Sequence, residues 1–486
     1  MSKLFNFTSF VAIVFFMSIF VYVAYRASTI ALTHDECNTY DIISPSGGGD
    51  SPFIKTANNH LINTWLIRQS TRLSGSNSEL ALRFPNVLAF LVYGIAVWLI
   101  LKPWKNNPLL YFSGYGLLLL NPYMIDFFSL ARGYGLALAF GLMAIYFFVK
   151  TREPGQMKYF ARDFFFSMLF SLLAAWSNFI LINLNIALLA LYLLEFLMFY
   201  QKQNLKENIH IVIGLLLMLG LNIHHINKIY DVLMVLNDNE ELYFGGNQGF
   251  IESTLRILIH RSIYLSYYGE QFWTRLYHGL LIGFFSLNIV LVFRAQYTAL
   301  TKVFSILVLM IASSVLQYYL FEIPYPKERT ALIFIPLMVL TVFMTGAEIS
   351  DWLSSYKPWA GLFVGGLMLL FIVLPLGYHF YQNLNTHYAF EWKLDANTKD
   401  VASLMKNDYE HQKTKTIVCS WEFKPALKYY LSKQDNAFNV FVDKDFETSS
   451  DYIYCFQKEK GMIADSAAYA TMIDFSDTKT VLLRRK

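Results

Sequence analysis

Charged residues are scarce in this chain of 486 residues: they make up 15% of it, against about a quarter of an ordinary soluble domain. Hydrophobic residues reach 55%. This composition, together with long unbroken apolar stretches, excludes an ordinary soluble enzyme and a disordered protein. What remains is a polytopic membrane protein. The aromatic content of 17% suits a helical bundle with aromatic side chains at the membrane interfaces.

Cysteine is scarce too, and neither sign of charge dominates. Three Cys exclude a disulfide scaffold and a Cys-rich metal site. The formal net charge is only +4, so nothing suggests a nucleic-acid partner. The sequence also shows no internal repeat, low-complexity tract or Pro-rich linker.

Apolar segments of about 20 residues, the length that spans a bilayer, recur along residues 1–380. They predict eleven crossings, of which the fifth is short and could be merged with its neighbour or re-entrant. The predicted spans are 8–31, 82–101, 108–122, 131–149, 164–177, 179–200, 208–226, 276–293, 303–321, 330–346 and 358–380.

Loop charges predict the orientation of these spans. Alternate short connections are basic, such as those that contain Lys102, Lys105 and Lys158. The other set includes two long acidic segments, 32–81 and 227–275. By the positive-inside rule the N-terminus is cytoplasmic, and an odd number of crossings places the C-terminus outside.

Residues 383–486 differ from the transmembrane part, 1–382, because charges return and long apolar runs stop. Alternating strand and helix patterns predict a small α/β domain on the extracytoplasmic side. Cys419 and Cys455 fall in mid-strand, where a small buried side chain is commoner than a disulfide. The predicted strands are 416–419, 438–442, 452–456 and 480–483, with a helix at 424–432.

The first long outer segment carries two adjacent acids directly after the first span. Asp35 and Glu36 follow His34 at the place where membrane meets water. One of these carboxylates can serve as general base at an interfacial active site. Two solvated loop acids are the plainer interpretation.

A second motif in the same segment predicts an amphipathic helix. Residues 61–66 place four apolar side chains on one face of a helix that would lie in the membrane interface. Asn58, Asn59 and His60 stand at its start, where free backbone N–H groups and the helix dipole favour an anion. Plain N-capping by an Asn, with His60 as a bystander, accounts for the same residues without a function.

Taken in order, these motifs resemble the GT-C membrane glycosyltransferases, within them the branch with the protein O-mannosyltransferases and the lipid A aminoarabinose transferase. The resemblance covers roughly residues 1–345. It is carried by His34-Asp35-Glu36, by Asn58-Asn59-His60 with 78–85, by Asn121-Pro122 with 129–134, and by Lys327-Glu328-Arg329 before Ile335-Pro336.

The resemblance implies a polyprenyl-phosphate sugar donor that is used on the outer side of the membrane, with inversion at the anomeric carbon. Asp35 would be the catalytic base, with Glu36 beside it. Arg132 and Arg329, at outer ends of spans, would hold the departing phosphate. The alternative without a catalytic role is that these side chains snorkel to the lipid headgroups. The implied substrate-binding residues are His34, Asn58, Asn59, His60, Arg132, Tyr134, Lys327 and Arg329.

We therefore expect a glycosyltransferase of the bacterial inner membrane, which moves a hexose or pentose to a hydroxyl of a lipid, glycan or protein. No cofactor and no metal ligand is assigned, and a divalent metal is left open. A transporter or lipid flippase with an accessory outer domain is the main alternative, and a non-catalytic scaffold for envelope assembly is a third. Transporters favour internal repeats and charged helices at mid-bilayer, whereas the residues of interest here lie at the outer boundary.

Overall fold

The computed structural model describes residues 2–44, 58–150, 157–199, 209–241, 245–264, 270–294, 298–408, 415–432 and 438–486. Parts of both long outer segments, residues 45–57, 242–244 and 265–269, lie outside this set. The chain forms two compact units. The described residues of the first unit fall within Met1–Val23, Phe53–Leu66 and Phe84–Leu384, and those of the second within Ala24–Pro52, Ile67–Arg83 and Asn385–Lys486.

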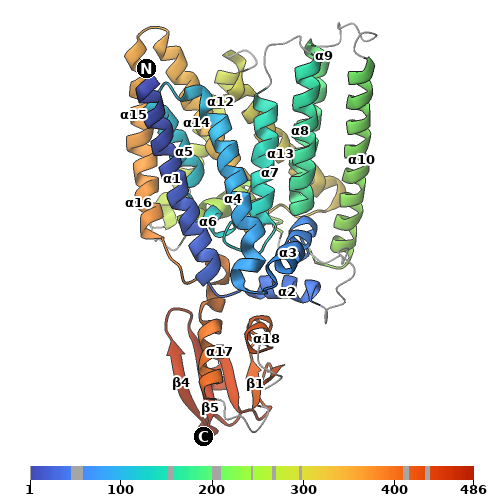
Figure 1. The fold of residues 1–486 in the computed structure, drawn as a ribbon, viewed down its shortest axis with the longest axis vertical. Coiled ribbons are helices and arrows are strands. Elements are labelled where there is room, and N and C mark those ends of the chain that lie inside the picture. Colours follow the sequence, from blue (N-terminus) through green and yellow to red (C-terminus); the bar gives the residue numbers. More distant parts are fainter. Residues whose placement is uncertain are drawn as a thin grey trace. The chain divides into compact units, whose positions relative to one another are not determined.

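The first unit is a bundle of long helices (Figure 1). Three of its helices, α1, α3 and α4, contribute one end to the second unit. The helices are α1 (Ser2–Thr29), α3 (Leu61–Ser74), α4 (Glu79–Leu101), α5 (Pro108–Leu119), α6 (Pro122–Asp126), α7 (Tyr134–Val149), α8 (Met157–Ser177), α9 (Ile182–Phe199), α10 (Ile209–Asp238), α11 (Ile257–Ile263), α12 (Glu270–Arg294), α13 (Ala299–Phe321), α14 (Phe334–Ser354), α15 (Pro358–Met368) and α16 (Leu374–Gln382).

Each of the predicted spans falls on a helix of the structure, which confirms a polytopic α-helical protein. The short fifth span, 164–177, is the second half of α8, a helix of 21 residues that is separate from α9. The count of eleven crossings stays a prediction. Among the described residues, seven helical stretches are long and apolar enough to cross a membrane: Phe7–Thr29, Glu79–Trp104, Phe179–Phe199, Ile209–Asp238, Ala299–Phe321, Phe334–Ser354 and Pro358–Gln382.

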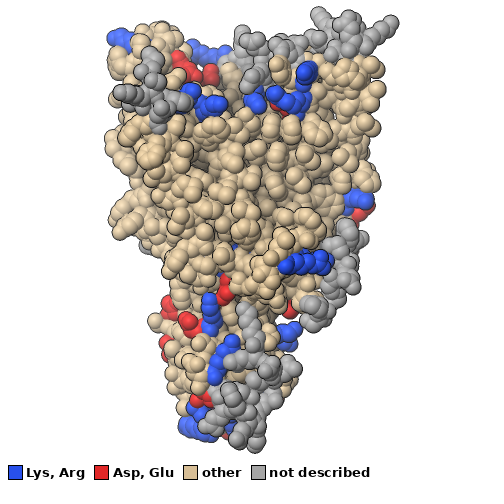
Figure 2. All heavy atoms as spheres, in the orientation of Figure 1, with Lys and Arg blue, Asp and Glu red and all other residues tan. Residues whose placement is uncertain are grey.

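The surface of the first unit suits a lipid environment. Figure 2 shows a broad belt of uncharged surface around the helices, with Lys and Arg gathered at the end near the N-terminus of α1. Large apolar side chains are exposed on the helices of this unit, such as Leu217 at 70% and Phe371 at 69%. In water an apolar surface of this extent would be strongly unfavourable. The chain is therefore an integral membrane protein.

The second unit contains a five-stranded sheet in the order β2-β1-β3-β5-β4. Strand β1 is parallel to its neighbours β2 and β3, whereas β5 is antiparallel to both β3 and β4. Apolar side chains of β1, β3 and β5 form its core, including Val418, Ile453 and Val481. The strands are β1 (Lys415–Cys419), β2 (Phe438–Val442), β3 (Tyr452–Phe456), β4 (Tyr469–Phe475) and β5 (Thr480–Arg485).

Helices α17 (Thr398–Asn407) and α18 (Lys424–Ser432) complete the predicted small α/β domain. The structure adds one strand, β4, which the sequence pattern does not reveal because this edge strand is half exposed on both faces and pairs only with β5. Cys419 and Cys455 are free and buried. Cys419 pairs with Tyr454 across the sheet, so the side chain of Cys455 points to the opposite face.

Candidate active site

The predicted site residues lie in two groups, one in each unit. We call the group around Asp35 in the second unit the carboxylate corner, and the group around Arg132 in the first unit the arginine cluster. The carboxylate corner comprises His34, Asp35, Glu36, Arg83, Asp395 and Glu422. The arginine cluster comprises Asn58, His60, Arg132, Tyr134 and Arg329.

The carboxylate corner is built on helix α2 (His34–Ile43), where the sequence suggested a loop. Thr33 and Glu36 form a capping box: the Thr33 side chain accepts the Glu36 N–H at 3.3 Å, and the Glu36 carboxylate accepts the Thr33 N–H at 2.9 Å. The Thr-x-x-Glu spacing was the signal for this helix. Asp35 thus lies in a first helical turn, where the dipole favours negative charge.

Glu36 and Arg83 form an ion pair in which both side chains are fully buried. Arg83 Nε donates to Glu36 Oε1 at 2.7 Å, and Arg83 Nη2 donates to Glu36 Oε2 at 2.7 Å. The remaining guanidinium donors bind the backbone carbonyls of Ala27, Ile30 and Ala31 at 2.7–3.2 Å, beyond and within the last turn of α1. All five N–H donors of the guanidinium are therefore used, and Glu36 positions the turn that carries Asp35.

Replacement of Glu36 by Gln should destabilise the protein strongly. The amide is neutral and turns an N–H group toward the guanidinium, so the buried Arg83 charge stays uncompensated. Breaking a buried ion pair in this way costs about 3–5 kcal/mol. Thermal unfolding of purified protein in detergent should show a clear drop in Tm for Glu36→Gln.

The matched control is Glu252→Gln, which breaks a half-exposed pair with Arg256 on one helix. Such a pair contributes only about 0.3–0.5 kcal/mol, so its Tm should hardly move. Equal Tm values for the two variants would show that Glu36 does not stabilise the corner.

Residues from the C-terminal part of the chain hold the same turn. The backbone N–H of His34 donates to Asp395 Oδ2 at 2.7 Å, and His34 Nδ1 donates to the Glu422 carbonyl at 2.7 Å. Just before α2, the Leu32 N–H donates to the Tyr430 hydroxyl at 2.8 Å. These partners lie more than 360 residues further along the chain. The backbone just before Asp35 is thus fixed by the C-terminal domain.

Asp395 is as deeply buried as Glu36, at 1% exposure. Burial raises its pKa well above the ordinary value, and the charges of Asp35, Glu36 and Glu422 raise it further. The hydrogen bond from His34 acts in the opposite direction. Asp395 Oδ1 and Glu422 Oε2 are buried and have no hydrogen-bond partner among the described residues. The corner therefore holds two unsatisfied carboxyl oxygens, and both belong to side chains whose charges interact with each other.

The arginine cluster begins at the segment that precedes α3. Arg132 is 2% exposed, and its Nη1 donates to the backbone oxygen and to the side-chain Oδ1 of Asn58. Its guanidinium carbon lies 5.9 Å from the centre of the Tyr134 ring. Arg132 is thus surrounded by protein, in contrast to a side chain that snorkels to lipid headgroups.

The charges of both arginines of this cluster act on His60. Its ring packs against Tyr134, with ring centres 4.9 Å apart. Burial lowers the pKa of His60 well below its ordinary value, and the charges of Arg132 and then Arg329 lower it further, against a hydrogen bond with the Ser177 backbone. Its burial therefore favours the neutral form of the ring. Its Nε2 has no partner among the described residues and is free to accept a hydrogen bond.

Gly133 permits the close packing between Arg132 and Tyr134. A Cβ atom at this position would lie 2.1 Å from the Ser177 carbonyl oxygen and 2.7 Å from the Cβ of His60. Both distances are far below van der Waals contact. Only glycine lets this loop approach His60 so closely.

A buried network that the sequence did not reveal fixes this loop to α3 and α4. Asn86 Nδ2 donates to Asn63 Oδ1 at 2.8 Å, and Asn63 Nδ2 donates to the Ala131 carbonyl at 3.1 Å. Asn86 Oδ1 accepts the Leu136 N–H at 3.2 Å. Both amides are completely buried. In the sequence, Asn63 and Asn86 are isolated polar residues within helical segments. Their hydrogen bonds to each other become evident only in the folded structure.

Two predicted residues have roles within their own turns. Asn59 accepts a hydrogen bond from the Thr64 hydroxyl at 2.8 Å, which fixes the start of α3. Lys327 precedes the 3-10 turn Glu328–Ala331, where its backbone N–H donates to Thr330 Oγ1 at 2.8 Å. Across the described part of the chain, no three His, Cys, Asp or Glu side chains converge as a metal site.

Comparison with solved structures identifies the fold. The chain is similar to ArnT from Cupriavidus metallidurans, in its apo state at a TM-score of 0.54 and bound to undecaprenyl phosphate at 0.53. In both cases 97% of each chain is covered, at 13% identity. ArnT is a lipid A aminoarabinose transferase with the GT-C fold. The chain therefore has the GT-C fold, and the resemblance seen in the sequence is confirmed at this level.

A weaker similarity extends to the Archaeoglobus fulgidus oligosaccharyltransferase in complex with Zn and sulfate. It has a TM-score of 0.41 and 13% identity over 91% of this chain and 68% of that chain, which is too low a score to carry an argument. No protein-family model matches the chain. No curated protein matches its sequence either.

Proposed function

We propose that this protein is a membrane glycosyltransferase that transfers a sugar from a polyprenyl-phosphate donor to an acceptor hydroxyl on the outer face of the membrane. The observation that carries the proposal is the arginine cluster. Arg132 and Arg329 come from segments almost 200 residues apart, and the charges of both act on the buried His60. A departing phosphate needs fixed cations of this kind, and of the two Arg132 is buried whereas Arg329 is partly exposed.

Arginine suits this role better than lysine would. Its planar fork can bind two phosphate oxygens at once, and it stays charged when it is desolvated. Neutral His60, with Nε2 as an acceptor, would take a hydrogen bond from a hydroxyl of the donor sugar. The similar fold of ArnT bound to undecaprenyl phosphate supports a lipid phosphate as the ligand.

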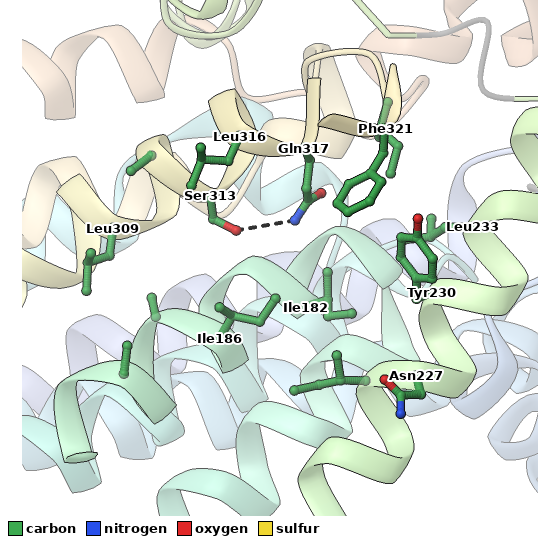
Figure 3. A pocket seen from close by; sticks show the side chains of 15 residues that line it. Ile182, Ile186, Asn227, Tyr230, Leu233, Leu309, Ser313, Leu316, Gln317 and Phe321 are labelled. Atoms are coloured by element: carbon green, nitrogen blue, oxygen red, sulfur yellow. Dashed lines mark hydrogen bonds between the residues drawn. The ribbon is translucent and has the colours of Figure 1, made fainter. Parts of the chain in front are cut away.

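An apolar cavity of about 500 Å³ in the first unit is suited to an isoprenoid chain. It lies between α9, α10 and α13 (Figure 3), and almost all of its lining is hydrocarbon. Two of its polar lining residues are hydrogen-bonded: Ser313 Oγ donates to Asn183 Oδ1 at 2.6 Å, and Gln317 Nε2 donates to Ser313 Oγ at 3.2 Å. The labelled lining residues are Ile182, Ile186, Asn227, Tyr230, Leu233, Leu309, Ser313, Leu316, Gln317 and Phe321.

The proposed reaction assigns the base to Asp35. The acceptor hydroxyl gives its proton to the Asp35 carboxylate while its oxygen forms a bond to the anomeric carbon of the donor sugar. The bond between that carbon and the phosphate oxygen breaks, and the lipid phosphate leaves with the electron pair. Attack from the face opposite the leaving group inverts the anomeric centre. Glu36 does not take part in the proton transfer because Arg83 and the Thr33 N–H occupy both of its oxygens.

The proposal places the protein in a bacterial inner membrane, with its N-terminus in the cytoplasm and the C-terminal domain outside. Incubation of membranes that contain the protein with a panel of polyprenyl-phosphate sugars tests the activity. We expect release of polyprenyl phosphate and transfer or hydrolysis of the sugar with at least one donor. Membranes that carry the Asp35→Asn variant at the same level are the control. Movement of the lipid across the bilayer without release of sugar would instead support a flippase.

A further inference from the structure

We infer that Trp421, Glu422 and Asp395 form a subsite for a sugar ring at the carboxylate corner, next to Asp35. The inference rests on the proposed function for the chemistry of its ligand. The subsite lies entirely within the second unit, and three independent features of that unit point to it.

The first feature is the position of Trp421 and Glu422, just after strand β1 of the sheet. β1 is followed by Ser420, Trp421 and Glu422, at the carboxyl end of the parallel strands. The chain leaves β1 through α18 toward β2 on one side, whereas β3 lies on the other side. In open α/β sheets, ligands bind outside the carboxyl ends of the strands at such a switch point. The Ser420 hydroxyl donates to Glu459 Oε2 at 2.6 Å and ties the connections after β1 and β3 together here.

The second feature is an aromatic surface without a covering. Trp421 is 58% exposed, although it follows a strand that ends in fully buried residues. The ring of His34 meets it edge to face, with ring centres 5.4 Å apart. His34 directly precedes Asp35, so the exposed indole packs against the residue next to the proposed base in the chain. The apolar C–H face of a sugar ring stacks on such a surface, as apolar ligand faces do on aromatic side chains.

The third feature is the pair of unsatisfied oxygens. Asp395 Oδ1 and Glu422 Oε2 are buried and lack a hydrogen-bond partner within the described ranges. Buried polar atoms are nearly always satisfied, so each such atom calls for an explanation. A sugar hydroxyl supplies a partner for either form of the carboxyl group, because it both donates and accepts. Carboxyl oxygens beside an aromatic face thus match the hydroxyl edge and the apolar face of one ring.

Binding of simple glycosides tests the subsite without any transfer reaction. Methyl β-D-glucopyranoside, methyl β-D-galactopyranoside and methyl α-D-mannopyranoside would be added to the full chain in lipid nanodiscs, which avoid sugar-headed detergents. We expect saturation transfer by NMR to the ring protons of at least one glycoside. Trp421→Ala should weaken binding by about ten-fold, the loss that corresponds to one aromatic contact. Trp421→Phe should retain part of it.

Trp359→Ala is the matched control, since Trp359 is 61% exposed on α15 in the other unit. It should leave glycoside binding unchanged. No saturation transfer to any of the three glycosides, or equal binding by Trp421→Ala and the unmodified protein, overturns the subsite.

Kinetics then distinguish whether the bound ring belongs to the acceptor or to the donor. An acceptor ring predicts that Trp421→Ala raises the acceptor KM and leaves donor hydrolysis unchanged, whereas a donor ring predicts a higher donor KM in both reactions. Unchanged KM values for both substrates contradict the subsite while the transferase activity stands. A protein that binds glycosides at Trp421 but transfers no sugar contradicts the proposed function alone.

Discussion

The Asp35→Asn variant should lose transfer activity by about 10²–10⁴-fold, the usual contribution of a general base. The amide keeps the shape of the side chain but cannot accept the proton of the attacking hydroxyl. Because the donor is held by other groups, kcat should fall while donor binding is largely kept. Initial rates of sugar transfer, measured beside equilibrium binding of the lipid-linked donor, check both parts of this expectation.

Asp41→Asn provides the matched control on the same helix. Asp41 lies in the last turn of α2, where its half-exposed carboxylate is 3.9 Å from Lys428. Its replacement should leave the rate within a small factor of the unmodified protein. An Asp35→Asn protein that transfers sugar at a near-normal rate would remove the carboxylate mechanism. A flippase would then be the better interpretation.

Arg132→Ala should reduce transfer by about 10²–10³-fold and weaken donor binding as well. Removal of one preorganised group that stabilises developing charge has an effect of this size in other enzymes. Arg132→Lys keeps the charge but loses the planar fork, so its rate should lie between those of the unmodified protein and Arg132→Ala. The measurement is kcat and KM for the lipid-phosphate donor, with Tm recorded for each variant.

Asn58→Ala separates a phosphate-binding role of Arg132 from a structural one. This variant removes the side-chain partner of Arg132 but leaves its charge in place. If Arg132 serves only to hold the segment before α3, the two alanine variants should lose the same activity and the same stability. If Arg132 binds phosphate, Asn58→Ala should be much the milder. If the Arg132→Lys variant is as active as the unmodified protein, the planar guanidinium of Arg132 is not required for phosphate binding, which contradicts the prediction.

The helical architecture could be predicted because its signal is local. Apolar runs of about 20 residues mark bilayer spans whatever surrounds them, and each predicted span coincides with a helix. Helix α2 was harder to recognise because its sequence, His34-Asp35-Glu36-Cys37-Asn38, has no apolar run. Its capping signal is short, and its stability depends on Arg83 and on the C-terminal domain.

Much of the candidate site could not be predicted because it depends on distant partners. Asp35, Arg132 and Arg329 stand at positions that match the family motifs, so they could be predicted as site residues from the sequence. Asp395 and Glu422 stand in ordinary polar contexts, and nothing nearby in sequence indicates that they meet His34. Burial of this kind arises only when segments more than 360 residues apart come together.

The contacts of the turn before Asp35 have a consequence for biosynthesis. The ribosome makes residues 24–36 among the first, but their partners Tyr388, Asp395, Glu422 and Tyr430 are made near the end of translation. Closing so long a loop is entropically costly and has to await the last segment. The nascent chain therefore cannot complete its carboxylate corner before almost all of the protein has been synthesised. A premature stop codon between codons 388 and 430 would remove at least one of these partners and leave a protein without a finished corner.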